Sequence, residues 1–183
     1  MIYSFTLKSV MLLVGFILIA AHLVALVRGK TTQDWLKSFP RNKPAGVILT
    51  AILAAWFFWL VKVSDLGEFS NWRSLVLYLT PVSAVLAIFF MQEFLAVRAL
   101  GGLALMAAEP LLEAAFMRDE QIRLLLVSLT YVWIIAGMFW VGMPYTLRDQ
   151  VAWVTSSETR WRAAAFAGLA YGALLCVGGL LGA

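Results

Sequence analysis

Two glutamates stand inside a stretch of the sequence that is otherwise apolar enough to cross a membrane. Glu109 and Glu113 lie within residues 94–116, and a spacing of four residues places both carboxylates on one side of an α-helix. An ionisable group at the centre of a membrane helix costs at least about 2.5 to 3.5 kcal/mol, so such groups usually face protein or water. A carboxylate pair in this setting could relay protons or bind a cation. Glu109 and Glu113 are therefore candidates for an ion or proton pathway.

The same stretch also has a structural interpretation. Pro110 has no backbone N–H to donate, so the carbonyl oxygen of Met106 is left as a possible further ligand near the glutamates. Glu113, however, lies close to the expected end of the helix at Phe116 and could sit among the outer headgroups. Glu109 could be a buried structural acid instead of a functional one.

Four charged residues of both signs are expected at one depth near the other end of this stretch. Glu93 and Arg98 flank its start, and Arg148 and Asp149 follow the next apolar run. A network of ion pairs among the four would hold the two helices together and offset the cost of inserting Arg98. The alternative is that each arginine extends separately toward lipid phosphate.

The composition indicates that lipid surrounds most of the chain. Of the 183 residues, 63% are hydrophobic and 13% are charged, whereas about a quarter are charged in soluble proteins. A helix of about 20 apolar residues crosses the 30 Å hydrocarbon layer of a bilayer. Such runs occur at residues 9–27, 44–63, 74–91, 94–116, 124–145 and 163–183. We predict an all-α polytopic transmembrane bundle, one domain over residues 1–183, because irregular backbone in lipid would leave its polar groups unpaired.

The distribution of lysine and arginine predicts the orientation of the spans, because these residues favour the cytoplasmic side. With six spans, nine of the 14 lie inside if both termini are outside. With five spans, the alternative in which residues 94–116 do not cross, Arg148, Arg160 and Arg162 would move outside. The charge distribution therefore favours six spans. We expect a multi-pass protein of a cell membrane, specifically of a bacterial inner membrane.

The longest loop is predicted to contain a short helix at residues 31–39 that lies on the cytoplasmic leaflet. Thr31 and Asp34 have the spacing of a capping box. Trp35 and Phe39 then fall near one side of the helix and can enter the interface. A loop anchored by an interfacial tryptophan is the alternative.

Small residues recur at intervals of four in the last apolar run. Ala164, Gly168 and Gly172 form a stripe that lets another helix approach closely, and Gly101 and Gly102 could act similarly in the fourth run. A packing partner within the same chain is favoured over one in another subunit.

Several kinds of site are excluded or disfavoured by composition. The single cysteine, Cys176, rules out an intramolecular disulfide and a Cys-x-x-Cys motif. The single histidine, His22, rules out a bis-histidine haem within one chain and disfavours a zinc site. The net charge of +4 comes from residues that flank the spans, so it indicates anionic lipid headgroups and not nucleic acid. No cofactor or metal is expected.

Three functions are compatible with these features. The first is a non-catalytic accessory or structural subunit of a membrane complex, which agrees with the lack of catalytic motifs and soluble domains. The second is a small homo-oligomeric transporter or channel for a proton, cation or small solute, using the acids of the fourth run. The third is a membrane-embedded lipid-modifying enzyme, which is disfavoured because polar residues do not cluster on one face.

Overall fold

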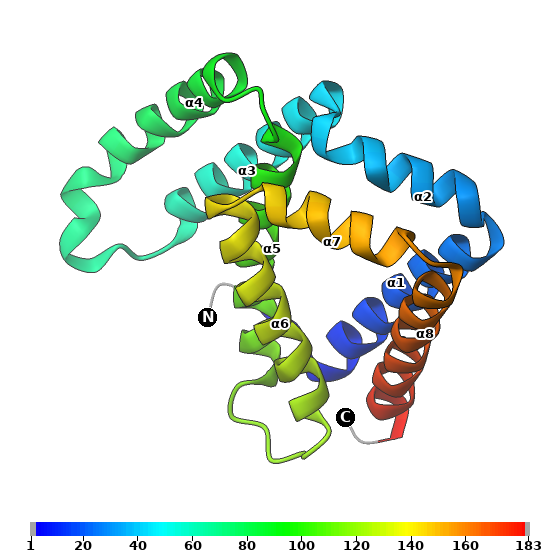
Figure 1. Ribbon diagram of the computed structural model, residues 1–183. Helices are drawn as coiled ribbons and strands as arrows, with labels where there is room; N and C mark the ends of the chain where they lie inside the picture. Colours follow the sequence, from blue (N-terminus) through cyan, green and yellow to red (C-terminus); the bar gives the residue numbers. More distant parts are fainter. Residues whose placement is uncertain (1–2, 182–183) are drawn as a thin grey trace.

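The structure is a computed structural model that describes residues 3–181. These residues form eight α-helices and two 3-10 helices, with no β-strand among them. Six of the α-helices are long and apolar enough to cross a membrane. They are α1 (Leu7–Val27), α3 (Lys43–Val63), α4 (Arg73–Phe90), α5 (Leu95–Ala115), α6 (Arg123–Gly142) and α8 (Glu158–Leu181). The shorter helices are α2 (Gly29–Ser38), η1 (Phe39–Arg41), η2 (Gly67–Trp72) and α7 (Tyr145–Thr155) (Figure 1).

The prediction of an all-α fold with six helices of membrane-spanning length is confirmed. The polar run at residues 94–116 forms one continuous helix, α5, despite the internal Pro110. Residues 182 and 183, at the end of the sixth predicted run, lie outside the described residues.

The fifth predicted run, residues 124–145, extends beyond the helix that the structure shows, because the helix is interrupted before Pro144. α6 ends at Gly142, and Met143 leaves the helical conformation with φ −127° and ψ 71°. Pro144 follows directly, and a proline disfavours the helical conformation of the residue before it. A separate helix, α7, begins at Tyr145. It was not predicted, since the segment is too polar for a span.

Two short helices, α2 and α7, contact each other and lie across one end of the bundle (Figure 1). We call this the α2–α7 end, and the opposite end, where α1 begins and α8 finishes, the terminal end. α2 covers most of the segment predicted as an interfacial helix, but it begins at Gly29 and no side chain caps it. Thr31 therefore lies inside the helix instead of capping it. The rings of Trp35 and Phe39 lie 5.4 Å apart, as expected for one side of this turn.

Contact between glycine backbones joins α1 to α8. A Cβ added at Gly15 would lie 2.8 Å from the carbonyl oxygen of Gly172, and one added at Gly172 would lie 2.9 Å from the carbonyl oxygen of Gly15. The two backbones touch because neither residue has a side chain. In lipid, helix association depends on such close packing, because acyl chains are as apolar as the side chains they would replace.

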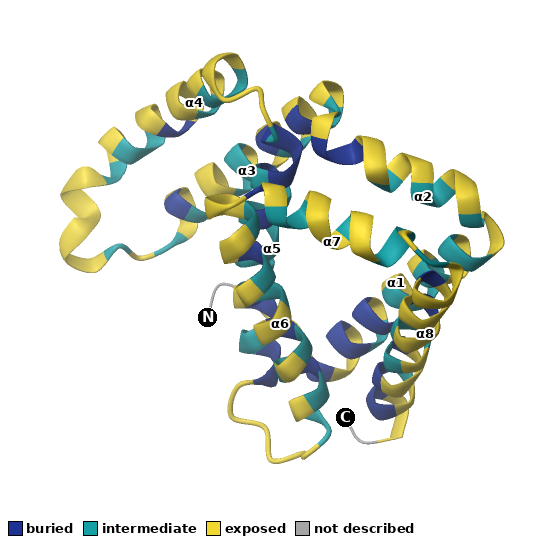
Figure 2. Ribbon diagram, viewed as in Figure 1, coloured by how far each residue is buried: buried dark blue, intermediate teal, exposed yellow. Residues whose placement is uncertain are grey.

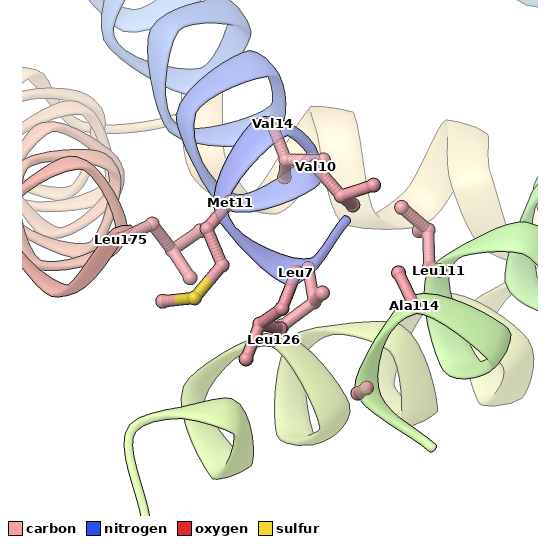
Figure 3. Close-up of a cluster of buried hydrophobic side chains, with 9 residues drawn as sticks. Leu7, Val10, Met11, Val14, Leu111, Ala114, Leu126 and Leu175 are labelled. Carbon is pink, nitrogen blue, oxygen red and sulfur yellow. The ribbon is translucent and has the colours of Figure 1, made fainter. Parts of the chain in front are cut away.

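A cluster of buried apolar side chains lies at the terminal end, where α1 meets α5, α6 and α8 (Figure 3). Met11, Leu126 and Leu175 are fully buried there, and Leu7 and Leu111 pack beside them. These residues come from four helices that are distant in sequence. The cluster therefore connects the α1–α8 pair to the rest of the bundle.

α5 is the central helix of the bundle, with α3 and α6 packed against it (Figure 2). A Cβ added at Gly101 would lie 2.8 Å from the carbonyl oxygen of Gly137 in α6, and one added at Gly102 would overlap Leu53 of α3. α4, in contrast, packs mainly against α3 and η2 and has one buried residue, Thr80. Of the six long helices, α4 thus receives the least cover from the described chain.

We expect Gly15→Ala to lower the melting temperature of the protein in detergent micelles by several degrees. The new methyl group would lie 2.6 Å from Cys176 Sγ and 2.8 Å from the Gly172 carbonyl oxygen, and overpacking costs about 1 to 3 kcal/mol. Gly142→Ala is the matched control, because no atom lies within 4 Å of a Cβ at that position. Equal melting temperatures for the two variants would contradict the close α1–α8 contact.

Candidate functional site

Glu109 is the exposed residue of the most deeply buried spanning helix. The structure describes every residue of α5. Ten of them are buried, and Glu109 alone is exposed. Gly102 lies on the same side of the helix two turns earlier and meets Leu53 of α3. Glu109 therefore lies on the α3-facing side of α5. Its carboxylate forms no hydrogen bond or ion pair with another described residue.

The exposure of Glu109 results from the divergence of α3 from α5 (Figure 1). The two helices begin side by side, where Gly46 lies against Leu95, and they separate toward the terminal end. N-terminal residues pack against the far part of α3. The ring of Tyr3 lies 5.8 Å from that of Trp59, and the Tyr3 hydroxyl accepts a hydrogen bond from Trp56 Nε1 at 2.7 Å.

Glu113, the second predicted acid, is half-buried and contacts the N-terminal segment. Its Oε2 accepts a hydrogen bond from the backbone N–H of Tyr3 at 3.2 Å. Glu113 therefore helps to hold the N-terminal segment between α3 and α5. The two glutamates share a side of α5, but only Glu113 is bonded to the rest of the described chain.

Arg98, at the α2–α7 end of α5, is bonded to a backbone carbonyl. Its Nη1 donates to the carbonyl oxygen of Val141 at 2.7 Å. Val141 lies in the last turn of α6, where carbonyl groups lack helical partners and the helix dipole is negative. This hydrogen bond partly offsets the free-energy cost of placing the guanidinium in an apolar environment. The Nε of Arg98 is buried without a partner among the described residues.

The predicted four-residue network is present only in part. Arg148 and Asp149 form an ion pair of 2.8 Å, with side chains 49% and 58% exposed. Within residues 3–181, neither pairs with Arg98 or Glu93, although Arg98 and Glu93 border the same small cavity. The reason is that the helix breaks at Pro144, so Arg148 and Asp149 lie on α7 instead of continuing α6 beside Arg98.

The three small residues predicted as a packing face of α8 have different surroundings. Gly172 meets Gly15 of α1, and Gly168 lies against the imidazole of His22. The His22 ring is oriented by a hydrogen bond of 2.7 Å between its Nδ1 and the Leu18 carbonyl oxygen. Ala164 is exposed and lines a cavity between α1, α2 and α8.

Three features of these sites were not predicted from the sequence. They are the Tyr3 contacts with α3 and α5, the carbonyl of Val141 that accepts from Arg98, and the cavity beside Ala164. Each joins residues that are far apart in the chain. The five alanines that border the cavity were a usable signal, because small residues leave space between helices.

Comparisons with known proteins add no family to this description. No protein-family model, curated protein or solved structure matches this chain. Within residues 3–181 there is also no group of three or more His, Cys, Asp or Glu side chains placed to hold a metal ion. A function must therefore be proposed from the arrangement of the side chains.

We expect Arg98 and Asp149 to contribute independently to stability. In a double-mutant cycle of Arg98→Gln and Asp149→Asn, the coupling free energy measured by unfolding in micelles should lie below about 0.5 kcal/mol, as for separate sites. Arg98→Gln alone should destabilise the protein, because it removes the bond to Val141. Asp149→Asn should change the free energy of unfolding little, because Asp149 belongs to an exposed ion pair with Arg148. A coupling above about 1 kcal/mol would support the four-residue network instead.

Proposed function

We propose that the protein is a non-catalytic accessory or structural subunit of a membrane complex. In this proposal, a transmembrane helix of a partner protein packs against the exposed position of α5 at Glu109. The partner helix carries a hydrogen-bond donor that pairs with Glu109. The protein spans the membrane six times, with the α2–α7 end in the cytoplasm.

The observation that carries the proposal is the exposure of Glu109 on an otherwise covered helix. Every other residue of α5 is at least partly covered by the described chain. An unpaired carboxylate at this depth is costly in lipid, and such residues usually face a partner or water. A donor from a neighbouring helix would remove this cost, and it would do so only in the assembled complex.

The surroundings of α4 support the same conclusion. α4 is a span-length helix with one buried residue, and large apolar side chains such as Leu79, Leu86 and Phe89 are exposed along it. Two of its hydroxyls already have partners, because Thr80 and Ser83 donate to carbonyl oxygens of their own helix. An apolar helix with free sides at the edge of the bundle is suited to packing against another membrane protein.

The orientation is supported by charge. Nine of the 14 lysines and arginines belong to the segments at the α2–α7 end, including Arg28, Lys43, Arg98 and Arg160. An excess of basic residues marks the cytoplasmic side of an inner-membrane protein. Both ends of the described chain then lie on the outer side, because Lys8 and Gly179 adjoin each other at the terminal end.

A second candidate function is proton or cation transport by a homo-oligomer. The observation that favours it is that Glu109 and Glu113 lie on one side of α5, one turn apart, beside the space between α3 and α5. In an oligomer, the spaces between α3 and α5 of neighbouring copies would join to form a polar path. Glu109 would then act as a titrating group instead of as an assembly contact.

Replacement of Glu109 should separate assembly from transport. With a photoreactive amino acid in place of Leu86 on α4, irradiation of native membranes should yield one adduct with a different membrane protein. Glu109→Gln should keep this adduct because an amide still accepts a hydrogen bond, and Glu109→Leu should lower its yield roughly tenfold. Glu120→Leu, an exposed glutamate outside α5, is the matched control.

The outcomes of this experiment distinguish the two candidates. An adduct of twice the chain mass, together with proton uptake by reconstituted liposomes that Glu109→Gln abolishes, would support transport. Equal adducts from Leu86 and from Leu174, an exposed position on α8, would contradict a specific partner face.

The purified protein alone should respond to Glu109→Leu in the opposite direction. In lipid nanodiscs without a partner, this variant should melt at a higher temperature than the wild type, because leucine removes an exposed carboxylate from the hydrocarbon layer. Thermal unfolding followed by tryptophan fluorescence measures the difference. A lower melting temperature would show that Glu109 already has a stabilising partner within the single chain.

A further inference from the structure

A cavity of about 780 Å³ lies at the α2–α7 end, away from Glu109. Its walls are the last turns of α1 and the first turns of α8, and α2 crosses over it. Its volume is within the range of about 300 to 1,000 Å³ that is usual for small-molecule sites. No feature of the proposed function uses this cavity.

Alanines line the cavity on both of the long helices that form its walls. Glycine contacts keep α1 and α8 together as far as Gly168, which lies against His22. The cavity beside this contact is lined by five alanines, Ala20, Ala21 and Ala25 of α1 and Ala164 and Ala165 of α8. Their methyl groups are too small to fill the space between α1, α2 and α8. These walls of the cavity are therefore apolar, and His22, Arg28, Thr31 and Thr32 add polar groups to its lining.

One wall of the cavity is held in place by Trp161. Its side chain is 6% exposed, and its Nε1 donates to the Ala25 carbonyl oxygen at 3.2 Å. This bond joins the start of α8 to the end of α1 at the edge of the cavity. Trp35, on the opposite side in α2, is exposed. The cavity is thus open to the surroundings at the depth where an interfacial tryptophan meets headgroups.

Arg28 is the charged residue that lines the cavity. Its guanidinium forms no hydrogen bond or ion pair with another described residue. Two neighbouring arginines of α8 are engaged instead: Arg162 pairs with Glu158 at 2.8 Å, and Arg160 lies 4.8 Å from the ring of Trp153. Asp34, the acid of α2, does not line the cavity. Arg28 therefore has donors available for an anionic ligand.

We propose that this cavity binds one anionic phospholipid of the adjacent leaflet. The phosphate accepts hydrogen bonds from Arg28, with the hydroxyl of Thr31 beside it, and one acyl chain lies against the alanines of α1 and α8. A guanidinium matches the geometry of a phosphate. Basic pockets between membrane helices on the cytoplasmic side are suited to anionic headgroups. The apolar interior requires that the ligand carry a hydrocarbon chain.

The test is lipid binding by the whole purified protein, measured by native mass spectrometry. The delipidated protein is titrated with phosphatidylglycerol, phosphatidylcholine or glycerol phosphate. We expect one phosphatidylglycerol to bind more tightly than phosphatidylcholine, with no displacement by glycerol phosphate. Arg28→Gln should weaken binding roughly fivefold, the effect of about one charge near a membrane surface.

Matched controls separate a built site from general attraction to charge. Lys30→Gln removes a neighbouring positive charge that does not line the cavity, and it should change binding little. Ala164→Leu should block the acyl chain while charge is unchanged, and Ala163→Leu, on the same turn but outside the cavity, should not. The Ala164 variant decides the matter if Arg28→Gln does not fold. Equal losses for Arg28→Gln and Lys30→Gln, or unchanged binding by Ala164→Leu, would overturn the proposal.

Discussion

The close approach of helix backbones at glycines is the constraint on which the rest of this bundle depends. In lipid, burying an apolar side chain against a neighbour gains little over contact with acyl chains, so helices associate through tight packing. Gly15 and Gly172 bring α1 onto α8, and Gly101 and Gly137 bring α5 onto α6. The buried cluster around Met11 and Leu126 then joins the two pairs at the terminal end.

Both candidate sites lie where this close packing stops. α3 leaves α5 beyond Gly102, and the exposed carboxylate of Glu109 lies two turns further along. The alanine-lined cavity with Arg28 lies next to the contact of Gly168 with His22, between α1, α2 and α8. Each site thus lies beside a close contact between helices. A partner helix or a lipid chain would complete the packing that the single chain leaves open.

The charged residues of α5 differ in whether the described chain supplies a hydrogen-bond partner for them. Arg98 donates to the carbonyl of Val141 at a helix end, and Glu113 accepts from the backbone N–H of Tyr3. Backbone groups of the same chain therefore serve as partners, which a search for opposite charges does not find. Glu109 has no such partner in the described chain. This difference is why assembly is assigned to Glu109 and a structural role to Glu113.

The helices themselves were determined by the sequence, because a run of about 20 apolar residues in lipid must satisfy its backbone internally. The six long helices follow from this local rule, and the charged residues of α5 are read directly from the sequence. The break at Pro144 and the start of α2 were misjudged, since helix ends depend on single residues. Only the tertiary structure decided that Arg98 meets Val141 and not Asp149, that Tyr3 reaches Glu113, and that Ala164 borders a cavity. These contacts join distant segments, and they depend on the angles at which helices cross, which local patterns do not contain.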